Sequence, residues 1–186
     1  MIEFRDLTAD EIEVRVQSIK EKDGKPSGVV LLLYKNARCD MNILDETVGA
    51  ENWQREHYEC KGNLFCRVGI RTCLKDNEAV AEWVWKSDCG VESNTEAQKG
   101  EASDSFKRAC FNWGIGRELY TSPFIWIPAE QCNIYDTKRM DKYGRPIYAT
   151  NDRFYVEKII IEDKKMKAIS IVNETKKARC FVWQRS

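Results

Sequence analysis

The sequence predicts an α+β protein with an antiparallel β-β-β-α core, in which a long helix packs on the sheet, an N-terminal hairpin precedes the core and a C-terminal β extension follows it. Three observations carry this expectation. Three strand-like runs separated by short turns fill residues 53–86, a helical apolar stripe follows at residues 102–113, and strand-like patterns recur near both ends of the chain. A helix next to such a meander buries its apolar stripe on the sheet.

The first expected elements are a hairpin and a short helix. Apolar residues alternate with polar ones over residues 12–16, the turn-forming segment 23–28 interrupts the pattern, and the apolar run 29–34 follows. Asp40 can cap a short helix whose apolar residues recur at spacings of three and four, and Gly49 is well placed to end it.

The central elements are three strands and the main helix. Residues 53–60 and 64–74 are separated by a hairpin-sized turn, and a third strand is expected over residues 79–86. In the helix expected over residues 95–113, the apolar residues gather into one stripe at about 100° per residue. The stripe consists of Ala102, Phe106, Ala109, Cys110 and Trp113.

The C-terminal part is expected to be mainly extended. Residues 120–127 should form an extended segment, and residues 132–152 a loop or a short hairpin. Strand-like runs follow at residues 154–161, 166–172 and 179–183.

The composition is that of a soluble globular protein. The 186 residues are 42% hydrophobic and 32% charged, with 30 basic and 30 acidic side chains. Residues 1–137 carry 17 Lys and Arg against 24 Asp and Glu (17 − 24 = −7), whereas residues 138–186 carry 13 against 6 (13 − 6 = +7). The two parts can pair with each other as readily as the basic one can bind a polyanion. With no membrane-length apolar run and an acidic start, a cytoplasmic protein is expected.

Metal and nucleotide chemistry find no support in the motifs. The eight cysteines form no CxxC pair and His57 is the only histidine, so a zinc ribbon is not expected and most thiols should be buried. The phosphate-cradling pattern GxxxxGK[ST] does not occur. We therefore expect no metal and no cofactor.

Cations along the main helix are the first candidates for a functional site. Lys99, Ser103 and Lys107 recur every four residues along one flank of the apolar stripe, and Arg108 is displaced from them by about 100°. Such a ladder can follow the phosphates of a single strand. It can equally be a solvated face, because three acids of the helix offset its charge. These are Glu96, Glu101 and Asp104.

The predicted sheet offers further cations. Arg67 and Arg71 share the non-core face of the middle strand with Phe65, and Arg55 lies with His57 on the neighbouring strand. Cations mixed with aromatic rings are typical of single-strand grooves, although antiparallel sheets also expose a polar face for solubility alone. Arg38, ahead of the short helix, could reach the same region.

Three segments together carry a family resemblance: KGEASDSFKRACFNWGIGRELY, LDETVGAENWQREHY and WVWKSDCG. They resemble the single-strand annealing family of the eukaryotic recombination protein Rad52, and most closely its bacterial and phage branch of Sak and DdrA types. The resemblance runs from about Arg38 to Trp126. It implies a β-β-β-α core, homo-oligomeric rings or helices, and annealing of complementary DNA strands without ATP or metal. Residues 1–137 would be the annealing core and residues 138–186 a basic, β-rich appendage of the same domain.

The resemblance also assigns residues. In the family a Lys-Arg pair of the helix lines the groove for the strand backbone, and the matching pair here is Lys107 and Arg108. Lys99 stands where the family tends to place another cation, and Arg38 matches a basic residue ahead of the short helix. Where some relatives carry a further Arg, this chain has Phe111. Single-stranded DNA, further copies of the chain and other recombination proteins are the partners so implied.

Rival hypotheses remain open at this stage. A helix, three strands and a helix with a Lys-Arg pair is also the outline of a module that reads the shape of duplex nucleic acid. A nuclease could use acidic pairs, Asp40 with Asp45 or Asp88 with Glu92, although neither pair has a partner that marks a metal site. An oligomeric scaffold without a nucleic-acid role is a further alternative. The hypothesis favoured is a non-enzymatic annealing protein of recombination and repair, encoded by a phage or prophage.

Overall fold

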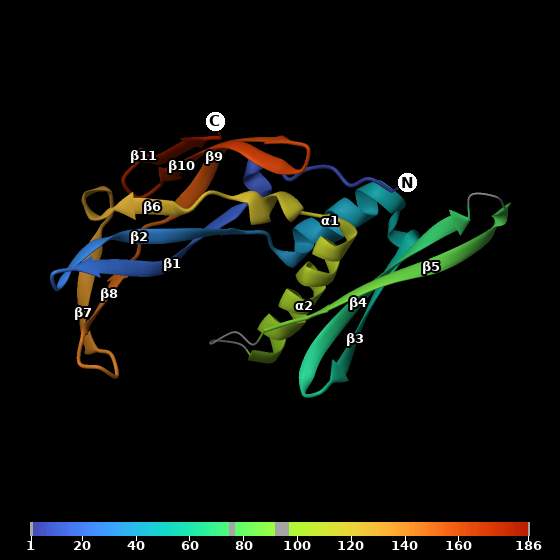
Figure 1. The fold of residues 1–186 in the computed structure, drawn as a ribbon, viewed down its shortest axis with the longest axis horizontal. Helices are drawn as coiled ribbons and strands as arrows, with labels where there is room; N and C mark the ends of the chain where they lie inside the picture. Colours follow the sequence, from blue (N-terminus) through green and yellow to red (C-terminus); the bar gives the residue numbers. More distant parts are fainter. Residues whose placement is uncertain (1, 75–76, 92–96, 186) are drawn as a thin grey trace. The chain divides into compact units, whose positions relative to one another are not determined.

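The computed structural model describes residues 2–74, 77–91 and 97–185, without the side chains of residues 73, 74, 77–80 and 97–99. Contacts divide the chain into two units (Figure 1). Unit 1 consists of residues 1–6 and 35–117, and unit 2 of residues 7–34 and 118–186. All of residues 138–186 therefore belong to unit 2 together with the opening hairpin. The division expected from the charges at residue 137 stays a prediction.

Unit 1 is a three-stranded antiparallel sheet with two α-helices. The helices are α1 (Ala37–Val48) and α2 (Ala97–Trp113), with a single 3₁₀ turn, η2 (Ala50–Asn52), after α1. The strands lie in the order β3 (Trp53–Cys60), β4 (Asn63–Leu74) and β5 (Asn77–Cys89). Lys61 and Gly62 both have positive φ, as a two-residue hairpin turn requires. The three predicted strands are thus confirmed.

The core of unit 1 lies between α2 and the sheet. Cys66, Val68 and Ile70 alternate along β4 and are fully buried on the face that α2 covers. Phe106, Ala109 and Cys110, from the predicted apolar stripe, are also fully buried. Strand alternation and helical periodicity therefore bury the two sets against each other.

Unit 2 is built almost entirely of antiparallel strands (Figure 1). A six-stranded sheet has the order β11-β10-β9-β1-β2-β6, and β7 and β8 form a separate hairpin. The sheet strands are β1 (Glu13–Lys22), β2 (Lys25–Tyr34), β6 (Ile125–Pro128), β9 (Phe154–Glu162), β10 (Lys165–Asn173) and β11 (Ala178–Gln184). The hairpin strands are β7 (Ile134–Met140) and β8 (Pro146–Thr150), and short 3₁₀ turns are η1 (Ala9–Glu11), η3 (Arg117–Thr121) and η4 (Ala129–Gln131).

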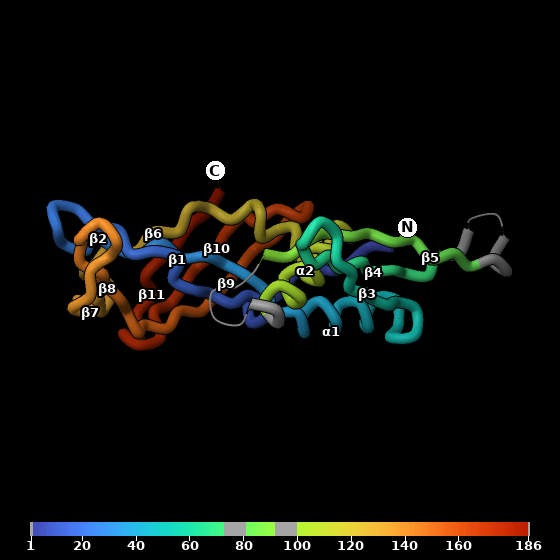
Figure 2. Tube along the Cα trace, turned by 90° about the horizontal axis from the view of Figure 1, so that it is seen from below, coloured from blue at the N-terminus to red at the C-terminus, as the bar shows by residue number. Residues whose placement is uncertain are grey.

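The six-stranded sheet has two parts joined at one point. Strands β9, β10 and β11 lie side by side (Figure 2), and β1 pairs with β2 over its whole length. Between these parts, β1 pairs with β9 only through Glu13 and Tyr155. Apolar side chains from both parts are buried, among them Val29, Ile127 and Ile171. The hairpin and the late strands expected from the sequence are therefore present.

Two local expectations were wrong. Helix α1 begins four residues before the predicted start: the side chain of Asn36 caps it by accepting hydrogen bonds from the N–H groups of Arg38 and Cys39, at 2.9 and 3.0 Å. Asp40, the predicted cap, lies inside the helix and is buried. The first residues of the expected extended segment 120–127 belong to the 3₁₀ turn η3 instead. Gly49 does follow the end of α1, as expected.

Candidate nucleic-acid interface

The two described acids of α2 accept hydrogen bonds from main-chain N–H groups at one end of the neighbouring sheet. The Glu101 carboxylate accepts a hydrogen bond from the N–H of Leu64 at 2.9 Å, and that of Asp104 accepts one from the N–H of Val91 at 3.1 Å. The two N–H donors lie near the start of β4 and just after the end of β5. The two described acids that could offset the helix cations are therefore occupied by main-chain groups, while Glu96 lies outside the described residues.

Lys107 lies on the flank of α2 that faces α1. It makes no ion pair with the residues that the structure describes, and its side chain is half-buried. Its positive charge is close enough to Asp40 to favour the ionised form of that carboxyl. Arg38, in the first turn of α1, is exposed. The helix packing therefore brings Lys107 to the end of α1 that carries Arg38.

A buried charged cluster supports this flank. Lys35 and Asp40 are 1% and 0% exposed and form an ion pair. The Lys35 ammonium lies 4.3 Å from the centre of the Phe111 ring, and its aliphatic stem packs so closely on Gly116 that an added Cβ there would lie 2.5 Å from Cε. Burial raises the pKa of Asp40 from 3.8 to about 6, although Lys35, Lys107 and Cys110 favour its ionised form.

Sequence reasoning missed this cluster, because a lysine and an aspartate five residues apart at the start of a helix look like ordinary surface charges. The one available signal was Phe111, an aromatic residue where some relatives carry an arginine. In this chain the ring covers the ammonium of Lys35.

Arg108 lies on the opposite flank of α2. Its Nε is 3.3 Å from Oδ1 of Asp88 on β5, and the two side chains are 41% and 27% exposed. A pair this exposed is worth about 1 kcal/mol or less, so this ion pair contributes little to stability. Lys107 and Arg108, adjacent in the sequence, therefore face different neighbours: α1 for the first and β5 for the second.

Arg55 lies on the side of the sheet that α2 covers. Its guanidinium carbon is 4.7 Å from the centre of the Phe106 ring, and that ring stacks on Trp53 at 6.1 Å. On the same strand, Nε2 of His57 lies 3.1 Å from the carbonyl oxygen of Ala102. Both side chains thus contact α2.

The other two sheet arginines lie on the opposite face. Arg67 and Arg71 alternate with the buried residues of β4 and so point away from α2. The structure therefore brings Arg38, Arg55, Lys107 and Arg108 to the helix side of unit 1 and separates Arg67 and Arg71 from them. Lys99 lies in α2, but its side chain is outside the described residues.

The comparison with protein families is decisive here. The Rad52/22 family of double-strand break repair proteins matches residues 5–134, which include the residues of unit 1 from Arg5 to Arg117. The chain belongs to the Rad52/22 family. Membership in this family links the chain to DNA repair and recombination. No curated protein and no solved structure matches it.

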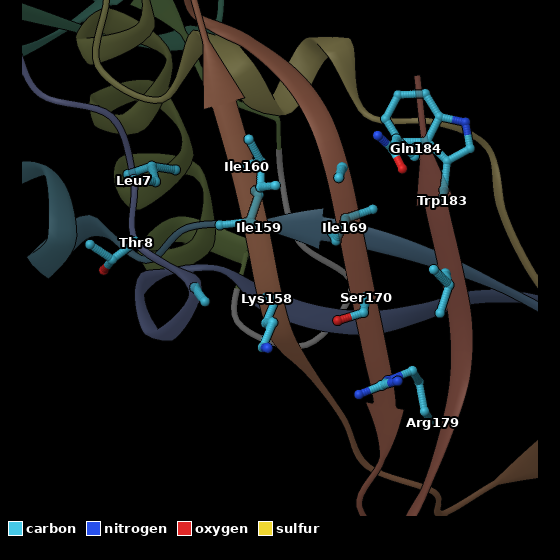
Figure 3. A pocket seen from close by; sticks show the side chains of 13 residues that line it. Leu7, Thr8, Lys158, Ile159, Ile160, Ile169, Ser170, Arg179, Trp183 and Gln184 are labelled. Carbon is cyan, nitrogen blue, oxygen red and sulfur yellow. The ribbon is translucent and has the colours of Figure 1, made fainter. Parts of the chain in front are cut away.

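Unit 2 contains a cleft of about 700 Å³ on β9, β10 and β11, which Leu7, Thr8 and Ala9 also line (Figure 3). Ile160 and Val182, which line it, are 53% and 68% exposed. One of its two cations, Arg179, pairs with Glu157 at 2.7 Å, and hydrogen bonds from Arg179 and Ser170 lower the pKa of that carboxyl to about 2.

Within the described parts of this Rad52/22 family member, no three His, Cys, Asp or Glu side chains are grouped closely enough to hold a metal ion. In the same residues, no helix is both long and apolar enough to cross a membrane. Burial raises the pKa of Cys66 to about 11, and that of Cys110 is also raised by burial. Both thiols are fully buried core residues, and burial favours their neutral form.

Proposed function

We propose that the chain binds single-stranded DNA and anneals complementary strands as a homo-oligomer, without ATP, metal or a catalytic step. Among members of the Rad52/22 family we place it in the bacterial and phage branch of Sak and DdrA types, on the sequence segments that resemble that branch. Its role would be homologous recombination or break repair, in the cytoplasm of its host.

The observation that carries the proposal is the separation of charges on α2. Glu101 and Asp104, the two described acids of α2, accept hydrogen bonds from main-chain N–H groups, and Lys107 lies on the flank of α2 next to α1 and Arg38. Cations that neutralise phosphates release counterions, and this favours binding whatever the base sequence. Annealing needs no more chemistry than this, because base pairing itself selects the complement.

Weak contacts in one subunit add up along an assembly. Several copies of unit 1 would offer one strand a series of phosphate contacts, so that the overall affinity exceeds that of any single site. This explains how a chain with zero net charge could hold a polyanion.

The test is oligonucleotide binding measured by fluorescence anisotropy over a range of salt concentrations. Lys107→Ala combined with Arg108→Ala should remove most of the binding and reduce the slope of log K against log salt by about 0.7 for each phosphate that the variant no longer neutralises. Asp88→Asn should strengthen binding, because a carboxylate that pairs with Arg108 and competes with phosphate is removed. Strand annealing should proceed with neither ATP nor divalent metal.

Lys20→Ala is the matched control, since Lys20 is an exposed lysine of unit 2. Particle mass, measured by light scattering, should be unchanged in all these variants. Affinity and salt slope that stay at the wild-type values in the double variant would refute the proposal. Tighter binding to duplex than to single strands would instead favour the duplex-reading module.

A further inference from the structure

The face of the three-stranded sheet opposite α2 carries an unusual number of aromatic and cationic side chains. We call it the outer sheet face. Its aromatic and cationic residues are Tyr58 on β3, Phe65, Arg67 and Arg71 on β4, and Trp83 and Trp85 on β5. The register pairs Tyr58 with Phe65 and Arg71 with Trp83 across neighbouring strands. From Phe65 to Arg71 the face extends about 20 Å along β4.

The aromatic rings form two pairs. Tyr58 and Phe65 stack with their centres 5.5 Å apart, and Trp83 and Trp85 lie 6.1 Å apart at 32° to each other. Tyr58 and Trp83 are 37% and 38% exposed. Buried aromatic residues would need no further explanation, whereas rings that remain partly exposed at both ends of one sheet face offer flat surfaces to a ligand.

The rings are held in place by the backbone and by an arginine. An added Cβ on Gly69 would lie 2.8 Å from the Trp85 ring, so the indole lies directly over the glycine. The guanidinium carbon of Arg67 is 4.5 Å from the centre of the same ring, and its Nη2 is 2.6 Å from Glu56. Trp85 and Arg67 are therefore fixed, whereas Trp83 is the more exposed indole of its pair.

The charge of the face favours an anionic ligand. Arg67 and Arg71 face one described acid, Glu56, which already pairs with Arg67. Arg71 is exposed, and with the part of the chain that the structure describes it makes no ion pair. A ligand that combines phosphate with flat aromatic surface matches this arrangement, in which arginines alternate with aromatic rings along the face.

We infer that the outer sheet face is a second site for single-stranded nucleic acid, at which unpaired bases stack on Trp83 and on the Tyr58–Phe65 pair while Arg67 and Arg71 hold phosphates. This inference rests on the proposed function and adds a different chemistry to it. The helix side of unit 1 contacts the sugar-phosphate backbone alone, whereas the outer sheet face distinguishes a strand that has bases from one that has none.

The test compares an oligothymidylate with an abasic strand of the same length, measured with the full-length protein by competition anisotropy. The wild type should bind the thymidylate more tightly than the abasic strand. Trp83→Ala should weaken thymidylate binding about tenfold, the scale of one base–aromatic stack, and leave abasic binding unchanged. Trp83→Phe should keep most of the preference, and Trp126→Ala, which removes an indole of similar exposure in unit 2, should keep all of it.

The outcomes separate this inference from the proposed function. Lys107→Ala should weaken binding of both strands equally, because it removes a phosphate contact. If Lys107→Ala acts in this way and Trp83→Ala does not change the preference for bases, the inference on the outer sheet face is wrong and the proposed function stands. If the wild type binds neither strand, both are wrong. A Trp83→Ala protein with normal circular dichroism but a smaller particle mass would show that the face joins two copies of the chain.

Discussion

Replacement of Lys35 by methionine is expected to destabilise unit 1 strongly at neutral pH. Methionine keeps the length of the stem that packs on Gly116 but removes the ammonium that pairs with Asp40. Asp40 is 0% exposed, so its carboxylate would be left buried without its main partner. Removal of one member of a buried pair costs about 3–5 kcal/mol in the free energy of unfolding.

The pH dependence follows from Asp40. Burial raises its pKa in the folded protein from 3.8 to about 6, which corresponds to about 3 kcal/mol between the protonated and ionised forms. The folded state therefore binds this proton more tightly than the unfolded state. The associated stability is fully present below the unfolded pKa of 3.8 and is lost as the pH rises through about 6.

Lys35 opposes this effect of burial, so its loss should raise the pKa of Asp40 further. The difference in stability between wild type and Lys35→Met should then be small at about pH 5, where Asp40 can take up a proton, and large at about pH 7.5. Lys107 and Cys110 also face Asp40 and remain in the variant. Urea denaturation followed by tryptophan fluorescence at both pH values measures the difference.

The double variant Lys35→Met with Asp40→Leu is the control. It removes both charges and should recover most of the lost stability, since an apolar pair of similar volume is often as stable as a buried ion pair. A Lys35→Met protein within about 0.5 kcal/mol of the wild type at neutral pH would refute the reasoning, because that is the range of an ordinary surface substitution. So would a double variant as unstable as the single one.

Two further substitutions test other parts of the chain. Gly116→Ala places a Cβ 2.5 Å from Cε of Lys35, at a φ of +76°. Thermal unfolding should show a loss of about 1–3 kcal/mol in the free energy of unfolding. An unchanged unfolding midpoint would mean that the turn adapts. In unit 2, Asp152 accepts hydrogen bonds from the N–H and the side chain of Asn133 and from Asn173, and these lower its pKa although burial opposes them. Asp152→Ala should lower the free energy of unfolding by about 2–3 kcal/mol, as measured by urea denaturation. The difference from wild type should shrink at acidic pH, where the wild type also loses the carboxylate. A difference that does not depend on pH would contradict this.

The extent of successful prediction depended on how local each feature is. The hairpin turn at Lys61–Gly62, the strands around it and the apolar stripe with Phe106 were predictable, because side-chain periodicity and turn chemistry act over a few residues. The start of α1 was misplaced, because both Asn36 and Asp40 have side chains that can cap a helix. The choice between them followed from the burial of Asp40 against Lys35.

The sequence by itself determined that β3, β4, β5 and α2 follow one another, and which basic and aromatic residues are available to bind DNA. These features follow from the spacing of apolar, polar and charged residues along the chain. The tertiary structure alone decided which cations share a face. It placed Arg55 against Phe106 but Arg67 over Trp85 on the other side of the sheet, and it directed Glu101 and Asp104 to main-chain N–H groups away from Lys107. The physical reason is that electrostatic and hydrogen-bonding partners depend on distances between segments far apart in the chain, which no local pattern records.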